Sequence, residues 1–387
     1  SGLIIGFLLG LSNGFAIITA QKFGAKNIAD MKKSFAMSLV IGTGISILFT
    51  IAGLLFLKPI LHFLNVPKHL VPVAKGYIAI IIAGLLATFL YDACAATLRA
   101  IGDAVTPLII LAISVALNIV GDLFFVVVLK TGVKGAAIAT VISQIAFVIC
   151  WIYMIRKYEI LRLQKEEFKD PSPIMVKEMI SAGMSMGFMS SLVNIGTLTL
   201  QTAINKLGKD IIIAHTAARK ISEIFMIMFS VFGQTMATYC GQNYGAGKYD
   251  RIRQGLKAVL GIGCVFSVII FILSHTISPY LISFIASSKN KEVIYWGTQY
   301  LVYDMSFQVV CVFIVILRNS LQGIGDQRTP VFSSFIELAG KVVFTLVFVR
   351  RFGYWAVIWT EPVIWICMVI PLIVTAAGNP VLFGKQK

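Results

Sequence analysis

The polar residues best suited to chemistry lie inside long apolar stretches of this chain. Asn118 and Asp122 are four residues apart, so they share one face of a helix expected at 107–129. A carboxylate in apolar surroundings is costly unless it takes up a proton, binds a cation through oxygen atoms, or bonds to a neighbour such as Asn118. We interpret the pair as a site for H⁺ or Na⁺. A polar clamp between two helices is the alternative.

Eight other polar residues within apolar stretches could line a cavity. They are Asn194, Gln201, Arg219, Glu223, Asp304, Gln308, Glu337 and Lys341. Arg219 with Glu223, and Glu337 with Lys341, have the four-residue spacing that allows an ion pair on one helix face. A purely structural ion pair explains both spacings as well as a cavity role does. Asp304 could instead lie near the outer interface.

The residues of enzymes and metalloproteins do not form a pattern here. The six cysteines are scattered without a CxxC motif, and the four histidines are dispersed. The segment 241–249 resembles a P-loop faintly, but its spacing is one residue too long and no Ser or Thr follows the lysine. We therefore expect no enzymatic activity, no bound metal other than Na⁺ at Asn118 and Asp122, and no cofactor apart from a coupling H⁺ or Na⁺.

The composition is that of a membrane protein. Hydrophobic residues make up 58% and charged residues 13% of the 387, against about 45–50% and about 25% in soluble domains. Because most apolar runs are long enough to cross about 30 Å of hydrocarbon as helices, we predict an all-α polytopic membrane protein. The eleven runs are 2–20, 35–57, 73–98, 107–129, 135–155, 174–205, 211–239, 256–277, 293–317, 330–349 and 355–377.

The basic residues set the expected orientation. The net charge is +16, and almost all Lys and Arg residues lie between the apolar runs. One side carries 19 of them and the other 11, so the first side is predicted to be cytoplasmic; it holds 21–33, 99–106, 156–177, 241–257, 318–329 and the C-terminus. Contact with anionic membrane lipid accounts for the charge, and no nucleic-acid partner is expected.

Two motifs occur twice in the same order. Gln21–Ala25 (Gln-Lys-Phe-Gly-Ala) reappears as Gln242–Ala246 (Gln-Asn-Tyr-Gly-Ala), and the connector Leu98–Pro107 reappears as Leu321–Pro330. All four lie in connections predicted to be cytoplasmic, so the two halves have the same orientation. A parallel repeat related by an axis along the membrane normal is a known transporter architecture.

The repeat also predicts the domain organisation. The second half has an apolar run, 174–205, before its copy of the first motif, and the first half has no counterpart to it. We therefore expect eleven spans here, with a first helix missing before Ser1, and two pseudo-symmetric six-helix bundles in the intact protein. The expected N-terminal lobe is 1–157, the charged cytoplasmic linker is 158–173, and the C-terminal lobe is 174–387.

Small residues in the chain have predicted structural roles. The Gly-Asp pairs at 102–103 and 325–326 predict a tight turn, with the Asp side chain capping the next helix. Glycines at 6, 10 and 14, and at 183 and 187, fall on single helix faces. Such faces are typical of close helix–helix packing in membranes.

With these motifs, the chain resembles the multidrug and toxic compound extrusion (MATE) transporters. The resemblance rests on Gln21–Ala25, on Leu98–Pro107, on the helix start Gly132–Thr140, and on their second-half copies, of which Gly353–Pro362 is the weakest. It extends over the whole chain, from near the start of the second helix to the twelfth. The bacterial members, near the DinF-like branch, are the most similar.

The resemblance implies export of small organic, often cationic, compounds by H⁺ or Na⁺ antiport, with two lobes alternating between outward and inward states. Asn118 and Asp122 match the cation-site pair on the family's fifth helix, and the other acid of that site lies on the first helix. Some Na⁺-coupled members carry acids on the seventh and tenth helices. Here the seventh offers only Asn194 and Gln201, and the tenth only Asp304. We expect a monomer in the bacterial inner (plasma) membrane.

Two other functions are open at this point. A flippase for lipid-linked or polysaccharide precursors has the same double-six architecture, but it would need several bases for pyrophosphate. The spans offer few, namely Arg219, Lys220 and Lys341. A membrane-embedded transferase would need a catalytic constellation, which the sequence does not indicate.

Overall fold

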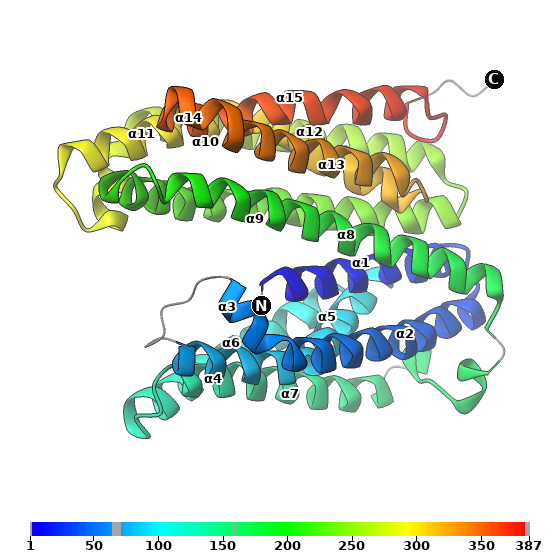
Figure 1. The fold of residues 1–387 in the computed structure, drawn as a ribbon. Coiled ribbons are helices and arrows are strands. Elements are labelled where there is room, and N and C mark those ends of the chain that lie inside the picture. Colours follow the sequence, from blue (N-terminus) through cyan, green and yellow to red (C-terminus); the bar gives the residue numbers. More distant parts are fainter. Residues whose placement is uncertain (1, 64–70, 158, 170, 384–387) are drawn as a thin grey trace. The chain divides into compact units, whose positions relative to one another are not determined.

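The computed structural model describes residues 2–63, 71–157, 159–169 and 171–383, and within them all regular elements are helices (Figure 1). The first half contains α1 (Gly2–Gly24), α2 (Ile28–Leu55), α3 (Leu57–Phe63), α4 (Val71–Ala83), α5 (Leu85–Ala100), α6 (Val105–Asp122), η1 (Leu123–Val128) and α7 (Val133–Lys157). Two short 3₁₀ turns follow, η2 (Glu159–Leu161) and η3 (Lys165–Phe168). They lie in the predicted linker 158–173, of which residues 158 and 170 are outside the described part.

The second half contains α8 (Pro173–Ile204), α9 (Lys209–Gly245), α10 (Tyr249–Ala286), α11 (Lys291–Ser306), α12 (Gln308–Gly323), α13 (Arg328–Val343), η4 (Phe344–Phe348), α14 (Val349–Phe352) and α15 (Tyr354–Gly378). Each predicted apolar run overlaps one of these helices or a consecutive group of them. Within the described residues, seven helices are long and apolar enough to cross a membrane, or up to nine if each of two bent pairs counts as one span. This is two fewer than the eleven predicted spans. The described apolar part of α7 is only Val133–Ile149, which is too short to be counted, and α8 is not among the helices that are apolar enough.

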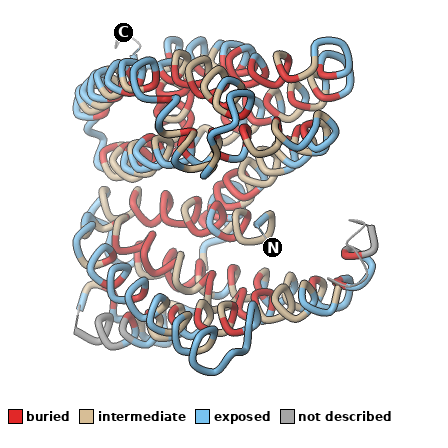
Figure 2. The backbone as a smooth tube through the Cα atoms, turned by 90° about the vertical axis from the view of Figure 1, so that its left-hand side faces the viewer, coloured by how far each residue is buried: buried red, intermediate tan, exposed pale blue. Residues whose placement is uncertain are grey.

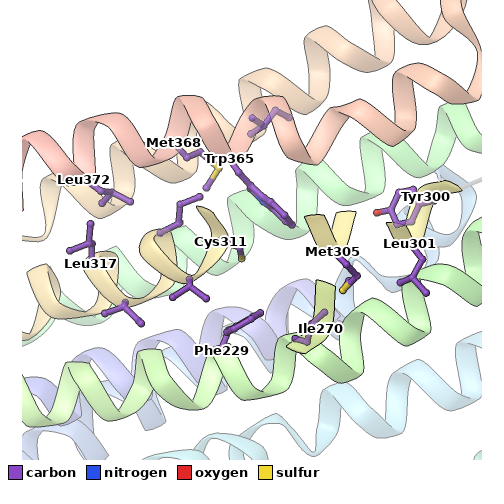
Figure 3. Packing of buried hydrophobic residues seen from close by; sticks show 14 of the residues in the cluster. Phe229, Ile270, Tyr300, Leu301, Met305, Cys311, Leu317, Trp365, Met368 and Leu372 are labelled. Carbon is purple, nitrogen blue, oxygen red and sulfur yellow. The ribbon is translucent and has the colours of Figure 1, made fainter. Parts of the chain in front are cut away.

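The chain forms two compact units, Ser1–Gly187 and Phe188–Lys387, which divide within α8. Each has its own apolar core, and buried positions run along the inner faces of the helices (Figure 2). In the second unit, Phe229, Met305, Leu317 and Leu372 come from α9, α11, α12 and α15 and belong to one buried cluster (Figure 3). The predicted lobe limits at 157 and 174 stay a prediction.

The outer faces of the helices are apolar, and several charged groups are inside. Leu108 and Val120 on α6, and Val265 on α10, are more than half exposed, whereas Glu337, Lys341 and Glu361 are buried. This distribution is the reverse of a soluble domain and suits helices whose outer faces meet lipid tails.

The repeat read from the sequence is present in the helix packing. In the first unit α1 packs against α2 and α5, and α6 packs against α7. In the second unit α9 packs against α10 and α12, and α13 packs against α15. The pair α4–α5 is bent by 46° and the pair α11–α12 by 50°. Each half therefore uses the same pairs of helices in the same order.

The two Gly-Asp connectors form the predicted turns. Gly102 has φ 94° and Gly325 has φ 98°, values that an L side chain rarely adopts. Asp103 accepts backbone hydrogen bonds from Val105 and Thr106 at 3.1 and 2.9 Å. Asp326 does the same for Arg328 and Thr329 at 3.0 and 3.2 Å. The capping prediction is confirmed in both halves.

Close packing between α1 and the start of α8 is also confirmed. A Cβ atom at Gly10 would collide with the backbone of Met186, and one at Gly14 would collide with the backbone of Ala182. In return, Gly183 lies against the ring of Phe15. The glycines let two backbones approach closely inside the first unit, as small-residue faces do in membranes.

Candidate ion-coupling residues

The α6–α7 contact of the first unit holds the predicted pair Asn118 and Asp122. Asn118 donates from Nδ2 to the Thr140 Oγ1 on α7 at 3.4 Å. One turn earlier, Ser114 Oγ donates to the backbone oxygen of Ser143 at 3.2 Å. The amide therefore bonds across to the neighbouring helix, whereas the sequence also allowed a bond to Asp122 on its own helix.

Asp122 is the last residue of α6. Its Oδ1 atom is buried and has no hydrogen-bond partner within the described part of the chain. A buried oxygen without a donor is unusual, because burial removes the water that would otherwise solvate it. Directly after Asp122 the chain winds into the π-helical turn η1, a rare geometry that is frequent at functional sites. The position is suited to a proton or a small cation.

The α13–α15 contact of the second unit holds a buried network of charges. Lys341 Nζ lies 2.9 Å from Glu337 Oε1 on its own helix and 3.1 Å from Glu361 Oε1 on α15. It also donates to Thr197 Oγ1 on α8 at 3.3 Å. The ion pair between Glu337 and Lys341 that the spacing predicted is present, but it belongs to a larger group from three helices.

Arg219 on α9 extends this network. Its guanidinium lies 3.5 Å from Glu223 on the same helix and 3.9 Å from Glu361. Glu223 is 65% exposed at its side chain, whereas Glu361 is 7% exposed. The pair of Arg219 and Glu223 therefore lies at the exposed edge of the network. Glu361 is the carboxylate that contacts both Arg219 and Lys341.

Asp304 forms a second polar contact in this unit, at the end of α11 just before the bend. It is 2% exposed, so it is buried in the helix bundle. Ser222 Oγ on α9 donates to its Oδ2 atom at 2.6 Å, and Gln308 Nε2 approaches the same oxygen at 3.5 Å. Gln308 Oε1 has no partner in the described residues.

The remaining predicted residues, Asn194 and Gln201 on α8, bond within their own helix. Asn194 donates to the backbone oxygen of Ser190 at 2.8 Å, and Gln201 donates to Asn205 at 2.9 Å. Neither bond reaches the charged network. The residue of α8 that does reach it is Thr197.

Two residues of the network, Glu361 and Thr197, were not among the predicted site residues. The repeat pairs α7 with α15, but it does not single out Glu361, because Ala136, Ile138 and Thr140 match Ala356, Ile358 and Thr360. The signal that could have found Glu361 is an acid directly before Pro362 inside an apolar run. The described residues contain no group of three or more His, Cys, Asp and Glu side chains that could hold a metal ion.

Three features define the class of a multi-pass membrane transporter. The helices have apolar outer faces suited to lipid, the chain contains a parallel repeat, and charged groups are buried in the helix bundle. The family model MatE matches residues 1–124 and 185–347, which is well over half of the chain. The chain belongs to the MATE family, a family of multidrug transporters and not of enzymes. The resemblance seen in the motifs is therefore confirmed.

Individual relatives agree with this assignment. The chain is 30% identical to the probable multidrug resistance protein YpnP of Bacillus subtilis over 303 residues, which cover 77% of the chain and 66% of YpnP. It is 24% identical to the probable multidrug resistance protein YoeA of the same organism, over 88% of the chain and 75% of YoeA. These bacterial relatives place the chain in the bacterial inner membrane as a multi-pass protein.

A solved structure of an outward-facing multidrug resistance MATE transporter of the MOP superfamily has the same fold. It superimposes with a TM-score of 0.89 at 18% identity, over 100% of the chain and 86% of that protein. At this sequence identity, the similarity is evidence for the fold alone. The predicted DinF-like branch and the predicted missing first helix stay predictions.

Proposed function

We propose that the chain is a secondary active multidrug exporter, which moves small organic, mainly cationic, compounds out of the cell in exchange for H⁺ or Na⁺. Two lobes alternate between inward and outward access in this scheme, and the protein works as a monomer. Family membership supports the transport of drugs. The coupling ion and the antiport step are our inference from the residues.

The observation that carries the proposal is the unpartnered oxygen of Asp122 in the α6–α7 contact. In this proposal, a proton or Na⁺ binds this oxygen in one state of the transport cycle and leaves it in the other. If drug and ion occupancy depend on the same conformational change, the two are linked by a coupling free energy.

The flippase alternative is weaker in the light of the charge network. A site for a pyrophosphate needs bases that are free to bind it. Lys341 and Arg219 already contact carboxylates, and Arg318 donates to Ser333 Oγ at 3.2 Å. Lys220 is exposed on α9. The in-span bases thus favour the exporter.

The test is transport of a fluorescent organic cation in proteoliposomes, with pH and Na⁺ gradients imposed separately. Asp122→Asn keeps the size of the side chain and removes its ability to take up a proton or to hold Na⁺ by charge. We expect the variant to fold and insert but to lose gradient-driven export. Full export by the variant under both gradients would contradict the proposal.

The matched control is Asp103→Asn in the α5–α6 connector. Asp103 is an acid of the same half, but it caps a helix and has backbone partners. Its variant should keep its response to both gradients. Equal losses in the two variants would show that removal of any acid in this half impairs export, and would remove the argument for Asp122.

A further inference from the structure

The internal repeat makes the α6–α7 contact of the first unit correspond to the α13–α15 contact of the second. The polar side chains in the two contacts differ in charge. Counted from Pro107 and Pro330, Asn118 corresponds to Lys341 and Asp122 corresponds to Thr345. The glycine before α7, Gly132, corresponds to Gly353 before α15, so these two helices correspond as well. The bond between Asn118 and Thr140 in the first unit thus joins the same two helices as the ion pair between Lys341 and Glu361 in the second.

The backbone supports this correspondence. The π-helical turn η1 starts at Leu123 and its counterpart η4 starts at Phe344, each at the end of the helix that carries the polar residues. Asp122 Oδ1 and Thr345 Oγ1, the two equivalent positions, are both buried without a hydrogen-bond partner in the described residues. The two contacts therefore lie at corresponding places in the two halves, although η4 begins two residues earlier than η1 when both are counted from the prolines.

In the second copy, the ammonium group of Lys341 has the surroundings of a bound cation. An ammonium has three N–H donors and no acceptor. Three oxygens from three helices lie around Nζ: Glu337 Oε1 at 2.9 Å, Glu361 Oε1 at 3.1 Å and Thr197 Oγ1 at 3.3 Å. The number of acceptors matches the number of donors. The distances to the two carboxylates are those of ordinary hydrogen bonds, and the distance to Thr197 is slightly longer.

The path of the Lys341 side chain is also shaped by the fold. A Cβ atom at Gly196 on α8 would lie 2.9 Å from Cδ of Lys341, so the absence of a side chain there leaves room for the lysine stem. The next residue, Thr197, supplies the third oxygen. Lys341 is 2% exposed. Its charge is buried, and the oxygens around it compensate the loss of water.

Lys341 is the base that contacts both buried carboxylates of the group, Glu337 and Glu361. Two guanidinium groups, those of Arg219 and Arg318, also act on these carboxylates. Arg219 is shared with the exposed Glu223, Arg318 is bonded to Ser333 one turn before Glu337, and Asp304 is bonded to Ser222. Without Lys341, Glu337 and Glu361 would lose the base that contacts both of them, and Arg219 would remain 3.9 Å from Glu361 and shared with Glu223.

We propose that Glu337, Glu361 and Thr197 form a binding site for a primary ammonium ion, and that the chain fills this site with its own Lys341. The second unit thus contains a built-in cation at the position where the first unit has Asn118 beside the open carboxylate Asp122. The comparison with the first unit rests on the proposed function, in which Asp122 takes its cation from solution. The ammonium site itself does not depend on that function.

The test uses the full chain purified in detergent, with Lys341→Ala to empty the site. Its melting temperature is compared in methylammonium chloride and in choline chloride at equal ionic strength. Methylammonium has the three N–H donors of the lysine head, whereas choline has none and is larger. We expect methylammonium to raise the melting temperature of the variant by several degrees over choline, and to have no such effect on the unchanged protein.

The control is the double variant Lys341→Ala with Glu361→Gln, which lacks one of the two carboxylates and should lose the methylammonium effect. If Lys341→Ala is too unstable to purify, its folded yield from cells grown with methylamine is compared with the yield of the double variant. A rise confined to Lys341→Ala supports the site. Equal behaviour in methylammonium and choline, or an equal rise in the double variant, contradicts it.

Discussion

The contacts α6–α7 and α13–α15 show how one framework can hold two different kinds of site. The helices, the connectors and the π-helical turns correspond between the halves, but the side chains at equivalent positions differ in charge. In the first half Asn118 and Thr140 form a neutral bond beside Asp122, which has an unpartnered oxygen. In the second half Lys341 and Glu361 form an ion pair with Glu337.

Under the proposed function, the two halves have separate roles. We propose that the carboxylate with the unpartnered oxygen exchanges an ion with the solution, whereas the ion pair of the second half does not. The first half is therefore the one expected to exchange an ion, whereas the second is held in a fixed charge state. The predictions that follow are ordered from the largest expected effect to the smallest.

The largest effect is expected from breaking the closed site. Glu361→Leu leaves Lys341 with one carboxylate and removes the carboxylate that also faces Arg219. Removing one partner of a buried ion pair costs about 3–5 kcal/mol. We expect a loss of this order in the free energy of unfolding, measured by denaturation in detergent. Thr140→Leu, which removes the α7 partner of Asn118 in the first half, is the control and should cost much less, because only a neutral bond is lost.

The second prediction converts the open site into a closed one. Asn118→Lys with Thr140→Glu copies the lysine and glutamate of the second half into the first. The new ammonium lies one turn from Asp122 and should neutralise it, as Lys341 neutralises its neighbours. We expect folded protein in which export no longer follows either a pH or a Na⁺ gradient. Export that still follows a gradient in this variant would show that the coupling ion binds elsewhere.

A smaller effect is expected at Gly196. The added methyl group of Gly196→Ala meets Cδ of Lys341 at 2.9 Å, so the lysine stem must shift. Overpacking of this kind costs about 1–3 kcal/mol. Thermal unfolding should show the loss, and it should shrink when Gly196→Ala is combined with Lys341→Ala. Additive losses in the double variant would mean that the methyl group does not act through the lysine.

The smallest effects are expected at the connectors, where the halves are alike. Asp103→Ala and Asp326→Ala each remove two hydrogen bonds to the start of the next helix. Loss of such a cap costs about 1 kcal/mol. We expect similar losses of thermal stability in the two variants. A large difference between them would show that the two connectors are not equivalent, which would weaken the alignment of the halves.

The features that the sequence predicted are those defined by short-range spacing. Apolar runs give the helices, a repeated Gly-Asp gives the turns and caps, and a four-residue interval gives the pairs Arg219 with Glu223 and Glu337 with Lys341. Each depends on the geometry of one helix or one turn. The packing of the glycines at 10 and 14 was also predictable, because glycines on one face leave the backbone as the contact surface.

The partners across helices could not be predicted in the same way. Whether Lys341 meets Glu361, or Asp304 meets Ser222, depends on how each helix is rotated about its axis, and apolar periodicity sets this rotation poorly in a helix that faces lipid. Asn118 bonds to Thr140 for the same reason, although Asp122 is nearer in sequence. The repeat contained part of this information, since it pairs α6 with α13 and α7 with α15, but it does not give the distance between side chains.

A direct measurement of ion binding tests the central claim, that the first half exchanges an ion and the second half does not. Binding of radioactive Na⁺ to the purified full chain, together with proton release on addition of Na⁺ in weak buffer, counts the exchanged ions in each variant. We predict that Asp122→Asn loses the exchanged ion, whereas Lys341→Met with Glu361→Gln, a neutral replacement of the closed pair, retains it. Ion exchange that persists in Asp122→Asn and disappears in the second-half variant would contradict the account.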